Sequence, residues 1–271
     1  MESHAGEKVG VIFPTFDEYP NRLSDSQIVP YVCDNEDFSY TADDLMTFFA
    51  DKNISLLLLI NPDNPSGHFM AKADVLRLAK WCEKRGVNLL LDESFVDFAD
   101  VTVDNSLLHN DILESYPHLM VMKSISKSYG VPGLRLGVFA SSDKALIARI
   151  RKEVSIWNIN SFAEFYLQIY GKYENDYKRA CEKFIAERET FYEELKSIPY
   201  LRVFPSKANY FMCEVIDKYT SAELTQRLID NDVLISNCGL KRNMSGRQLI
   251  RLAVRSREDN SRLVNILKAL A

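Results

Sequence analysis

The chain has 271 residues, enough for one large domain with a small domain beside it. Hydrophobic residues make up 46% of it and charged residues 26%, an ordinary globular mixture that excludes a disordered or fibrous chain. The net charge is −5 and no long run of Lys and Arg occurs, which excludes the electrostatic signature of a protein that binds nucleic acid or an anionic membrane. We therefore expect small-molecule partners.

The longest purely apolar run, Leu56 to Ile60, is far too short to span a bilayer, and the first residues do not form a signal peptide. We predict a soluble, cytoplasmic protein. The five cysteines show no Cys-x-x-Cys spacing, so we expect reduced core thiols and no metal site. They are Cys33, Cys82, Cys181, Cys213 and Cys238.

Short apolar runs in the first half of the chain are typical of strands that are buried on both faces. These runs are Val9–Phe13, Leu56–Ile60, Val87–Leu91, Leu119–Met122 and Leu136–Ala140. Segments with apolar residues at helical spacing alternate with these runs; one example is the set Val75, Leu78, Ala79 and Cys82. A further helix is expected over Asp143–Ile156. The order predicts an α/β domain with a mostly parallel sheet and helices on both faces.

Residues 161–197 contain no proline and predict one or two long helices leading out of the sheet domain. Beyond Pro199, short strand-like segments alternate with turn residues and predict a small α+β domain. Its expected strands are Leu201–Phe204, Tyr210–Val215, Val233–Ile235 and Leu249–Val254, with helices over Ser221–Asp230 and at the end of the chain. The predicted units are therefore a large domain (1–170), a connecting helix (171–198) and a small domain (199–271).

Polar residues follow three of the expected strands, at the edge where α/β sheets bind ligands. Asn64 lies in Asn-Pro-Asp-Asn-Pro-Ser-Gly, whose prolines and glycine fix the loop, although an ordinary turn would look the same. Asp92 emerges from a buried strand in Asp-Glu-Ser-Phe, where a carboxylate must either cap a helix or pair with a cation.

The third segment, residues 124–137, combines hydroxyls, a lysine, an arginine and glycines, which suits a bound phosphate and a nucleophilic amine. A solvated basic loop is the alternative. Ser124 and Lys127 also fit the Ser-x-x-Lys pair of serine hydrolases, but the companion motifs of those enzymes are missing from the sequence. Arg251 alternates with apolar residues on an expected strand, where its guanidinium needs an anion, either a substrate carboxylate or a structural acid.

Together these segments resemble the fold-type I pyridoxal-phosphate enzymes of the aminotransferase class I/II family, most closely the histidinol-phosphate aminotransferase and threonine-phosphate decarboxylase branch. The resemblance extends from Phe13 to the last helix. It implies a fold of the pyridoxal-phosphate transferase type, pyridoxal 5'-phosphate as cofactor, an amino acid and a 2-oxo acid as small-molecule partners, and a homodimer.

The resemblance also implies roles for individual residues. Lys127 would bond covalently to the cofactor, and Asp92 would pair with its pyridine nitrogen and keep the ring an electron sink. Further cofactor contacts are implied for Phe16 (ring stacking), Asn64 (ring hydroxyl), and Ser124, Ser126 and Arg135 (phosphate). Substrate contacts are implied for Arg251, which would hold the α-carboxylate, and for Asn158, Asn160 and Asn209 at the pocket edge, although each asparagine could equally be a cap or turn residue.

The sequence departs from the family pattern at three positions. Phe95 stands where aminotransferases of this branch usually carry tyrosine, and Arg255 stands where many have glycine; both residues resemble decarboxylase-like members. Ser236 stands where both groups usually have an arginine for a phosphorylated substrate, which argues against such a substrate unless Lys241, Arg242 or Arg255 substitutes.

The family also has a leading segment, with a glycine-containing helix start that holds the cofactor phosphate, and nothing before Val9 matches it. We therefore expect an N-terminally incomplete large domain that is more open to solvent, binds the cofactor weakly or not at all, and turns over poorly. Our first hypothesis is transamination, in which an amino acid, or an amino-acid phosphate such as histidinol phosphate, gives its amino group to a 2-oxo acid. The alternatives are decarboxylation of the threonine-phosphate type, a fragment without cofactor or activity, and a hydrolase that depends on Ser124.

Overall fold

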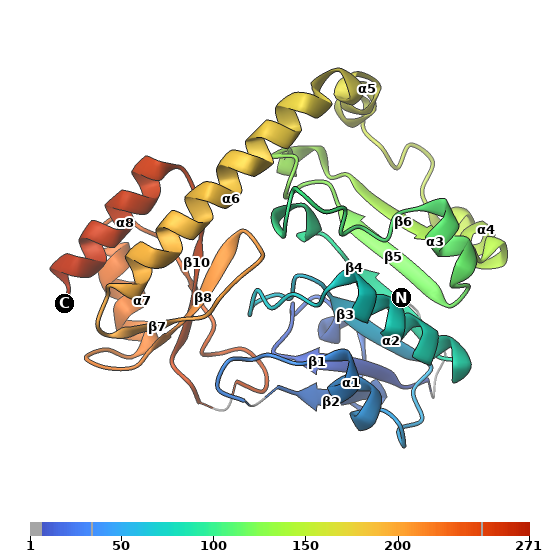
Figure 1. Ribbon diagram of the computed structural model, residues 1–271, viewed down its shortest axis with the longest axis horizontal. Coiled ribbons are helices and arrows are strands. Elements are labelled where there is room, and N and C mark those ends of the chain that lie inside the picture. Colours follow the sequence, from blue (N-terminus) through green and yellow to red (C-terminus); the bar gives the residue numbers. More distant parts are fainter. Residues whose placement is uncertain (1–6, 34, 245) are drawn as a thin grey trace.

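The computed structural model describes residues 7–33, 35–244 and 246–271, which form two sheets joined by a long helix (Figure 1). The larger sheet has the strand order β2-β1-β3-β4-β5-β6, in which the first five strands run parallel and β6 is antiparallel to β5. The strands are β1 (Val9–Phe13), β2 (Ile28–Val32), β3 (Leu56–Ile60), β4 (Asn88–Asp92), β5 (Leu119–Ser124) and β6 (Gly137–Ser141). The expected α/β class with a mostly parallel sheet is confirmed.

The two faces of this sheet are covered unequally. One face packs in a large apolar core with α1 (Ala42–Phe48) and α2 (Lys72–Lys84), and residues of α3 (Asn110–Ser115) join that core. The opposite face has a smaller core around Val11 and Leu58, and no helix of the described residues belongs to it. Our expectation of helices on both faces is therefore met mainly on one face.

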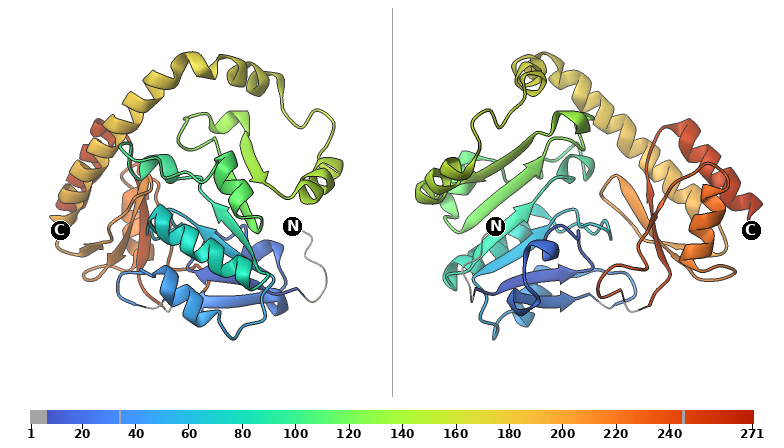
Figure 2. Two further views of the ribbon diagram at one scale, coloured as in Figure 1. Left: turned by 45° about the vertical axis from the view of Figure 1, so that its right-hand side comes forward. Right: turned by 180° about the vertical axis from the view of Figure 1, so that it is seen from behind.

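A chain segment arches from β6 to the small domain (Figure 2). It contains α4 (Lys144–Glu153), α5 (Ser161–Ile169) and α6 (Glu174–Lys196), so the expected long helices are present. Arg188 of α6 is fully buried and donates to the carbonyl oxygens of Phe98 and Ala208. Because those carbonyls belong to the two domains, this guanidinium fixes α6 to both.

The small domain is an antiparallel sheet with the order β7-β8-β10-β9. Its elements are β7 (Leu201–Val203), β8 (Tyr210–Val215), α7 (Ser221–Ile229), β9 (Ser236–Asn237), β10 (Leu249–Ala253) and α8 (Arg257–Ala269). Alternate residues of β8, such as Phe211 and Cys213, share a core with residues of α6, α7 and α8, whereas Met212 belongs to the core of the large domain. The expected strand at 233–235 is wrong, because the Val233 amide still closes the turn after α7 by donating to the Leu228 carbonyl.

All five cysteines are free and buried, as expected for core thiols. Burial raises the pKa of Cys82 to about 12, so this thiol stays protonated. Among the described residues, no helix is long and apolar enough to cross a membrane.

Candidate active site

Four neighbouring strands, β1, β3, β4 and β5, run parallel, so the segments that follow them meet at one edge of the large sheet. Phe16 follows β1, Asn64 follows β3, Asp92 ends β4 and Ser124 ends β5. The topology thus gathers residues that are 108 positions apart in sequence (124 − 16) at one edge.

Asp92 is held by hydrogen bonds on both carboxylate oxygens. Its Oδ1 accepts from the backbone amide of Ser94 at 2.9 Å and from the Ser94 hydroxyl, and its Oδ2 accepts from the Tyr19 hydroxyl at 2.6 Å. The Ser94 hydroxyl oxygen in turn accepts from the Ser124 amide at 2.9 Å, which ties the ends of β4 and β5 together. Asp92 is 8% exposed, so its carboxylate is fixed in direction and largely shielded from water.

Tyr19 is a site residue that the sequence did not reveal. Burial and the neighbouring Asp92 carboxylate raise the pKa of its phenol far above the usual value, so the phenol remains a hydrogen-bond donor. A tyrosine in a turn has no motif of its own. The one available signal was its place three residues after Phe16.

Asn64 and Arg251 meet across the two domains. Arg251 Nη1 donates to Asn64 Oδ1 at 2.7 Å, and the guanidinium carbon lies 4.9 Å from the centre of the Tyr210 ring. Asn61 instead exchanges hydrogen bonds with the backbone of Met70, which pins the loop and leaves Asn64 as its site-facing amide. Within the described ranges Arg251 has no carboxylate partner, so the guanidinium remains available for a bound anion.

The turn after β5 contains the expected phosphate and amine residues. Ser126 is buried and its amide donates to the Ser124 hydroxyl at 3.3 Å, while Lys127 and Arg135 are exposed. Arg135 adopts a left-handed backbone (φ 57°) and donates to the Pro132 carbonyl at 3.1 Å. In the part of the chain that the structure describes, neither cation has an acidic partner, and no hydrogen bond joins Ser124 to the Lys127 amine as a hydrolase pair would require.

The two aromatic residues expected at the cofactor differ in burial. Phe95 is buried and packs edge-on against Tyr210, with ring centres 5.2 Å apart at 85°. Phe16 is 44% exposed and contacts Tyr19 edge-on at 6.0 Å. Phe95 therefore forms part of a fixed wall, whereas Phe16 is open on one side.

The remaining residues that were expected to contact the substrate form no hydrogen bond to Asp92, Asn64 or Arg251 in the described ranges. Asn160 caps α5 by accepting from the Ala163 amide at 3.0 Å, and it also donates to the Leu134 carbonyl, so it has the capping role. Asn158 is exposed and Asn209 is half-buried. Arg255 is exposed and pairs with Asp259 at 2.8 Å, one helical turn further on.

Four residues bear on whether the substrate carries a phosphate. Ser236 lies close to Arg251, and the other three, Lys241, Arg242 and Arg255, form ion pairs with carboxylates. Ser236 is directly opposite Arg251 in the β9–β10 ladder. Lys241 pairs with Asp17, and Arg242 pairs with Asp25 at 3.0 Å. The structure therefore offers no unpaired cation among the three candidates Lys241, Arg242 and Arg255.

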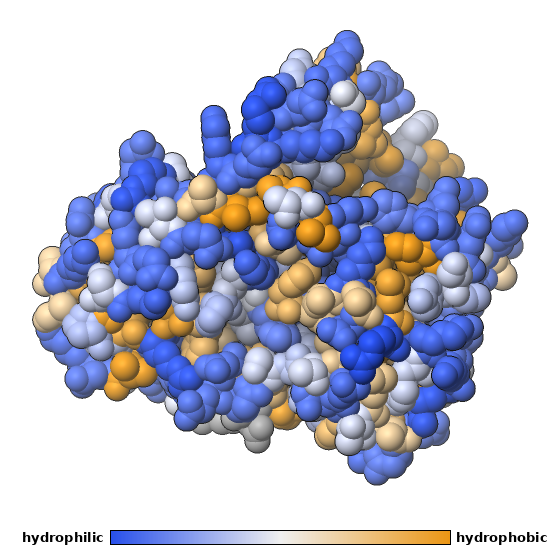
Figure 3. Space-filling model, viewed as in Figure 1, coloured by the Kyte–Doolittle hydropathy of each residue, from blue (hydrophilic) through white to orange (hydrophobic). Residues whose placement is uncertain are grey.

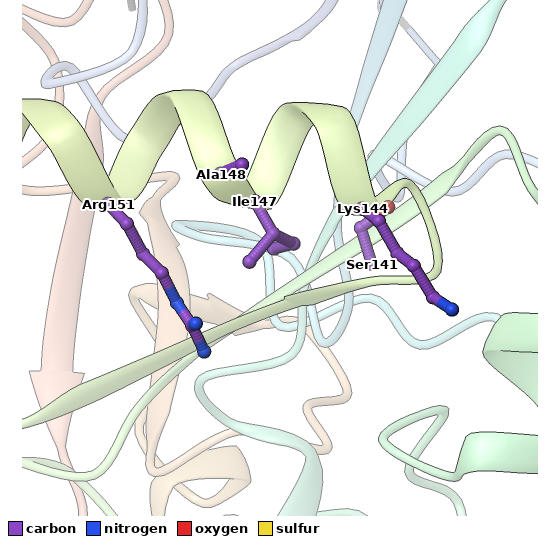
Figure 4. A pocket seen from close by; sticks show the side chains of 5 residues that line it. All are labelled: Ser141, Lys144, Ile147, Ala148 and Arg151. Atoms are coloured by element: carbon purple, nitrogen blue, oxygen red, sulfur yellow. The ribbon is translucent and has the colours of Figure 1, made fainter.

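A hollow of about 460 Å³ lies elsewhere, beside α4, and Figure 4 shows its lining. Ser141 precedes the helix, and Lys144, Ile147, Ala148 and Arg151 belong to it. None of the residues discussed above lines this hollow. Because it lacks a carboxylate or a buried polar group, we place the chemistry at the strand ends instead.

The aminotransferase class I and II family model matches residues 1–267. The chain belongs to this family. Its members are pyridoxal-phosphate dependent, as the resemblance implied. The residues at the strand ends fit that group: a fixed carboxylate suits a protonated pyridine nitrogen, and hydroxyls with an unpaired guanidinium suit a phosphate.

Among curated proteins, the chain is 30% identical to the L-serine phosphate decarboxylase Cj1436c of Campylobacter jejuni, over 96% of this chain and 67% of that protein. It is 26% identical to the histidinol-phosphate aminotransferase of Ruminiclostridium cellulolyticum, over 98% of this chain and 71% of that protein. It is 31% identical to the CMP-5'-(3-aminopropyl)phosphonate synthase of Streptomyces rubellomurinus, over 93% of this chain but only 40% of the synthase.

Among solved structures, a decarboxylase from Sulfurospirillum multivorans superposes with a TM-score of 0.87 and 29% identity, covering 97% of this chain and 75% of the other. The fold-type I assignment is therefore confirmed, and both reaction types occur among the relatives.

Proposed function

We propose that the protein uses pyridoxal phosphate to transfer the amino group of an amino acid to a 2-oxo acid. The observation that supports this proposal best is the Arg251 guanidinium, which is hydrogen-bonded to Asn64 and has no acidic partner in the described ranges. An unpaired arginine beside the cofactor site suits the α-carboxylate that all amino acids share, because the guanidinium can hold it through two parallel hydrogen bonds.

The other residues then have distinct tasks. The bound cofactor supplies an electron sink that weakens the bonds at the substrate's Cα. Asp92, fixed by Ser94 and Tyr19, keeps a proton on the pyridine nitrogen, and Asn64 orients the ring hydroxyl. Lys127 takes the proton from the substrate's Cα. Ser124, Ser126 and Arg135 would hold the phosphate, Phe16 would stack on the ring, and Asn158, Asn209 and Arg255 would border the substrate, whereas Asn160 caps α5.

The α-carboxylate contact assigned to Arg251 suits both transamination and loss of carbon dioxide, because both reactions begin from the same bound amino acid. Transamination also requires a base for the Cα proton, and we assign that role to Lys127, which has no acidic partner in the described ranges.

Decarboxylation is the second candidate, and Phe95 favours it. Phe95 lacks the hydroxyl of the tyrosine that aminotransferases of this branch usually carry at this position, and in this it resembles decarboxylase-like members. The 30% identity to an L-serine phosphate decarboxylase also favours decarboxylation. The paired states of Lys241, Arg242 and Arg255 argue for a substrate without a phosphate.

We also propose that the protein acts as a homodimer and binds neither nucleic acid nor membrane.

The two reactions are separated by what they release. The protein, loaded with pyridoxal phosphate, would be given amino acids labelled at the carboxyl carbon, including L-serine phosphate, together with 2-oxoglutarate. We expect formation of the corresponding 2-oxo acid with the label retained. Release of labelled carbon dioxide without consumption of 2-oxoglutarate would instead establish decarboxylation.

Arg251→Lys tests the substrate site in the same assay. A point-charge ammonium cannot reproduce the bidentate contact, so we expect KM to rise about tenfold or more for every amino acid that reacts. An unchanged KM would mean that Arg251 only stabilises the domain contact.

A further inference from the structure

Tyr210, the first residue of β8, contacts three parts of the proposed site at once. Its ring lies 4.9 Å from the Arg251 guanidinium carbon and 5.2 Å from the Phe95 ring. Its hydroxyl donates to the backbone carbonyl of Asp63 at 2.7 Å. The side chain is 3% exposed, so these contacts are shielded from water.

The register of the small sheet places Tyr210 beside Arg251. Tyr210 is opposite Ala253 and Arg251 is opposite Met212 in the antiparallel ladder of β8 and β10. Residues offset by two positions in this way are diagonal neighbours on the same face of a sheet. The ring contact therefore follows from strand pairing within the small domain, and a phenylalanine would preserve it.

The hydroxyl makes a different contact, because it reaches across to the large domain. Asp63 immediately precedes Asn64, the residue to which Arg251 donates, and its carbonyl also accepts from the Gly67 amide at 2.9 Å. A further bond from the Lys207 amide to the Gly67 carbonyl, at 2.9 Å, joins the same loop to the small domain. The distance between Arg251 and Asn64 thus depends on how the two domains are joined at this loop.

The phenol is suited to be a permanent donor in this position. Burial, with the Asp63 and Asp92 carboxylates nearby, raises the pKa of Tyr210 well above its ordinary value. This shift favours the protonated hydroxyl, which is the form that donates to the Asp63 carbonyl.

Building on the function proposed above, we propose that Tyr210 is a positioning residue: its hydroxyl bond to the Asp63 carbonyl sets the spacing of Arg251 and Asn64 and so the affinity for the substrate carboxylate. The residue touches neither substrate nor cofactor through this hydroxyl. It acts on substrate binding through the loop that presents Asn64.

The test is Tyr210→Phe, which removes the hydroxyl and keeps the ring. We expect KM for the amino acid to rise about fivefold, the change that corresponds to one lost hydrogen bond, with kcat and the dissociation constant of pyridoxal phosphate changed by less than about twofold. If Tyr210 were merely structural, its replacement would lower the midpoint of thermal unfolding without raising KM at nearly constant kcat.

Tyr200→Phe is the matched control. Tyr200 is 2% exposed, and its hydroxyl donates to the Leu267 carbonyl of α8 at 2.7 Å, a bond of the same kind and length within the small domain. This variant should lose comparable thermal stability with KM unchanged.

A second readout does not depend on turnover. The dissociation constant of 2-methylalanine, which has no Cα hydrogen for transamination, would be measured by calorimetry on the cofactor-loaded protein. We expect Tyr210→Phe to weaken this binding about fivefold and to have a much smaller effect in the Arg251→Lys background, because both changes act on one contact.

Two outcomes separate the possible failures. If the unmodified protein reacts with amino acids but Tyr210→Phe changes KM no more than Tyr200→Phe does, the positioning role is wrong and the proposed function stands. If the unmodified protein neither binds pyridoxal phosphate nor reacts with any amino acid, the proposed function fails and the positioning role fails with it.

Discussion

Two lysines near the end of β5 are in opposite electrostatic settings. Lys123 is buried, and its Nζ lies 2.8 Å from the Asp97 carboxylate, which also accepts from the Ser128 hydroxyl at 2.6 Å. This ion pair engages the Lys123 amine. Lys127 is exposed and has no acidic partner among the described residues.

We therefore predict that borohydride reduction of the cofactor-loaded protein fixes the cofactor to Lys127 alone, because its amine lies at the strand ends and is not engaged by a carboxylate in the described ranges. Peptide mapping by mass spectrometry would locate the label. A label on Lys123 or Lys144 would overturn the assignment of Lys127.

Asp92 and Phe95 lie in the same strand-end segment but should differ in importance. Asp92→Ala removes the one carboxylate that we assign to the pyridine nitrogen, and we expect kcat to fall about a hundredfold or more. Phe95→Tyr only adds a hydroxyl, and Tyr19→Phe removes one donor to Asp92 while keeping the carboxylate, so each should cost less than about tenfold. Steady-state kinetics on the three variants would check this order, which near-normal turnover of Asp92→Ala would contradict.

The order of the predicted strands along the sequence was sufficient to place Asn64, Asp92 and Ser124 at one edge of the sheet. A parallel sheet brings the carboxyl ends of its strands together, however far apart they are in sequence. This order could not find Tyr19, whose contact with Asp92 depends on the path of a turn. It also could not decide between the two roles of Asn160, since a helix cap and a pocket-edge amide use the same residue type. The structure shows the cap.

The loop after β3 contains a buried carboxyl group that should respond to pH. Burial raises the pKa of Asp63 from 3.8 to about 7, despite hydrogen bonds from Ser66 and the charge of Lys241, which act in the opposite direction. Between these two values the folded protein holds a proton that the unfolded chain has released. The contribution of Asp63 to stability therefore falls as pH rises from about 4 to about 7.

Asp63→Asn removes this titration and keeps the shape of the side chain. We expect the midpoint of thermal unfolding of the variant to rise relative to the unmodified protein as pH increases from about 5 to about 8. Differential scanning calorimetry at both pH values would measure the difference. A constant difference would show that the carboxyl does not titrate in this range.

The five strands expected from apolar runs lie within a residue or two of their observed bounds. The expected burial on both faces is wrong for β6, which lies at the edge of the sheet and has no buried residue. The edge strand β2 was missed, since only Ile28 of its five residues is buried and Pro30 interrupts it. An edge strand needs hydrogen bonds on one side only, so it tolerates a proline that the sequence pattern counts against a strand.

On the scale of the whole molecule, the outlying segment around α5 exposes an unusual amount of apolar surface. Trp157 is 93% exposed, Ile156 83% and Phe162 80%, and Phe165 is 61% exposed. Figure 2 shows this segment standing away from the large sheet, and Figure 3 shows apolar atoms toward the top of the molecule, where α5 lies. Monomers rarely expose apolar groups in this concentration, so the surface supports the proposed homodimer.

Trp157 provides a direct test, because the chain has only two tryptophans and the other, Trp81, is half-buried on α2. In the Trp81→Phe variant all tryptophan emission comes from Trp157. If a second copy covers the segment, the emission should shift to shorter wavelength and become less accessible to acrylamide as protein concentration rises, in step with dimer formation measured by sedimentation. The matched Trp157→Phe variant, which reports Trp81, should show no such dependence. Trp157 emission that stays fully quenchable while sedimentation shows a dimer would place the interface elsewhere on the molecule.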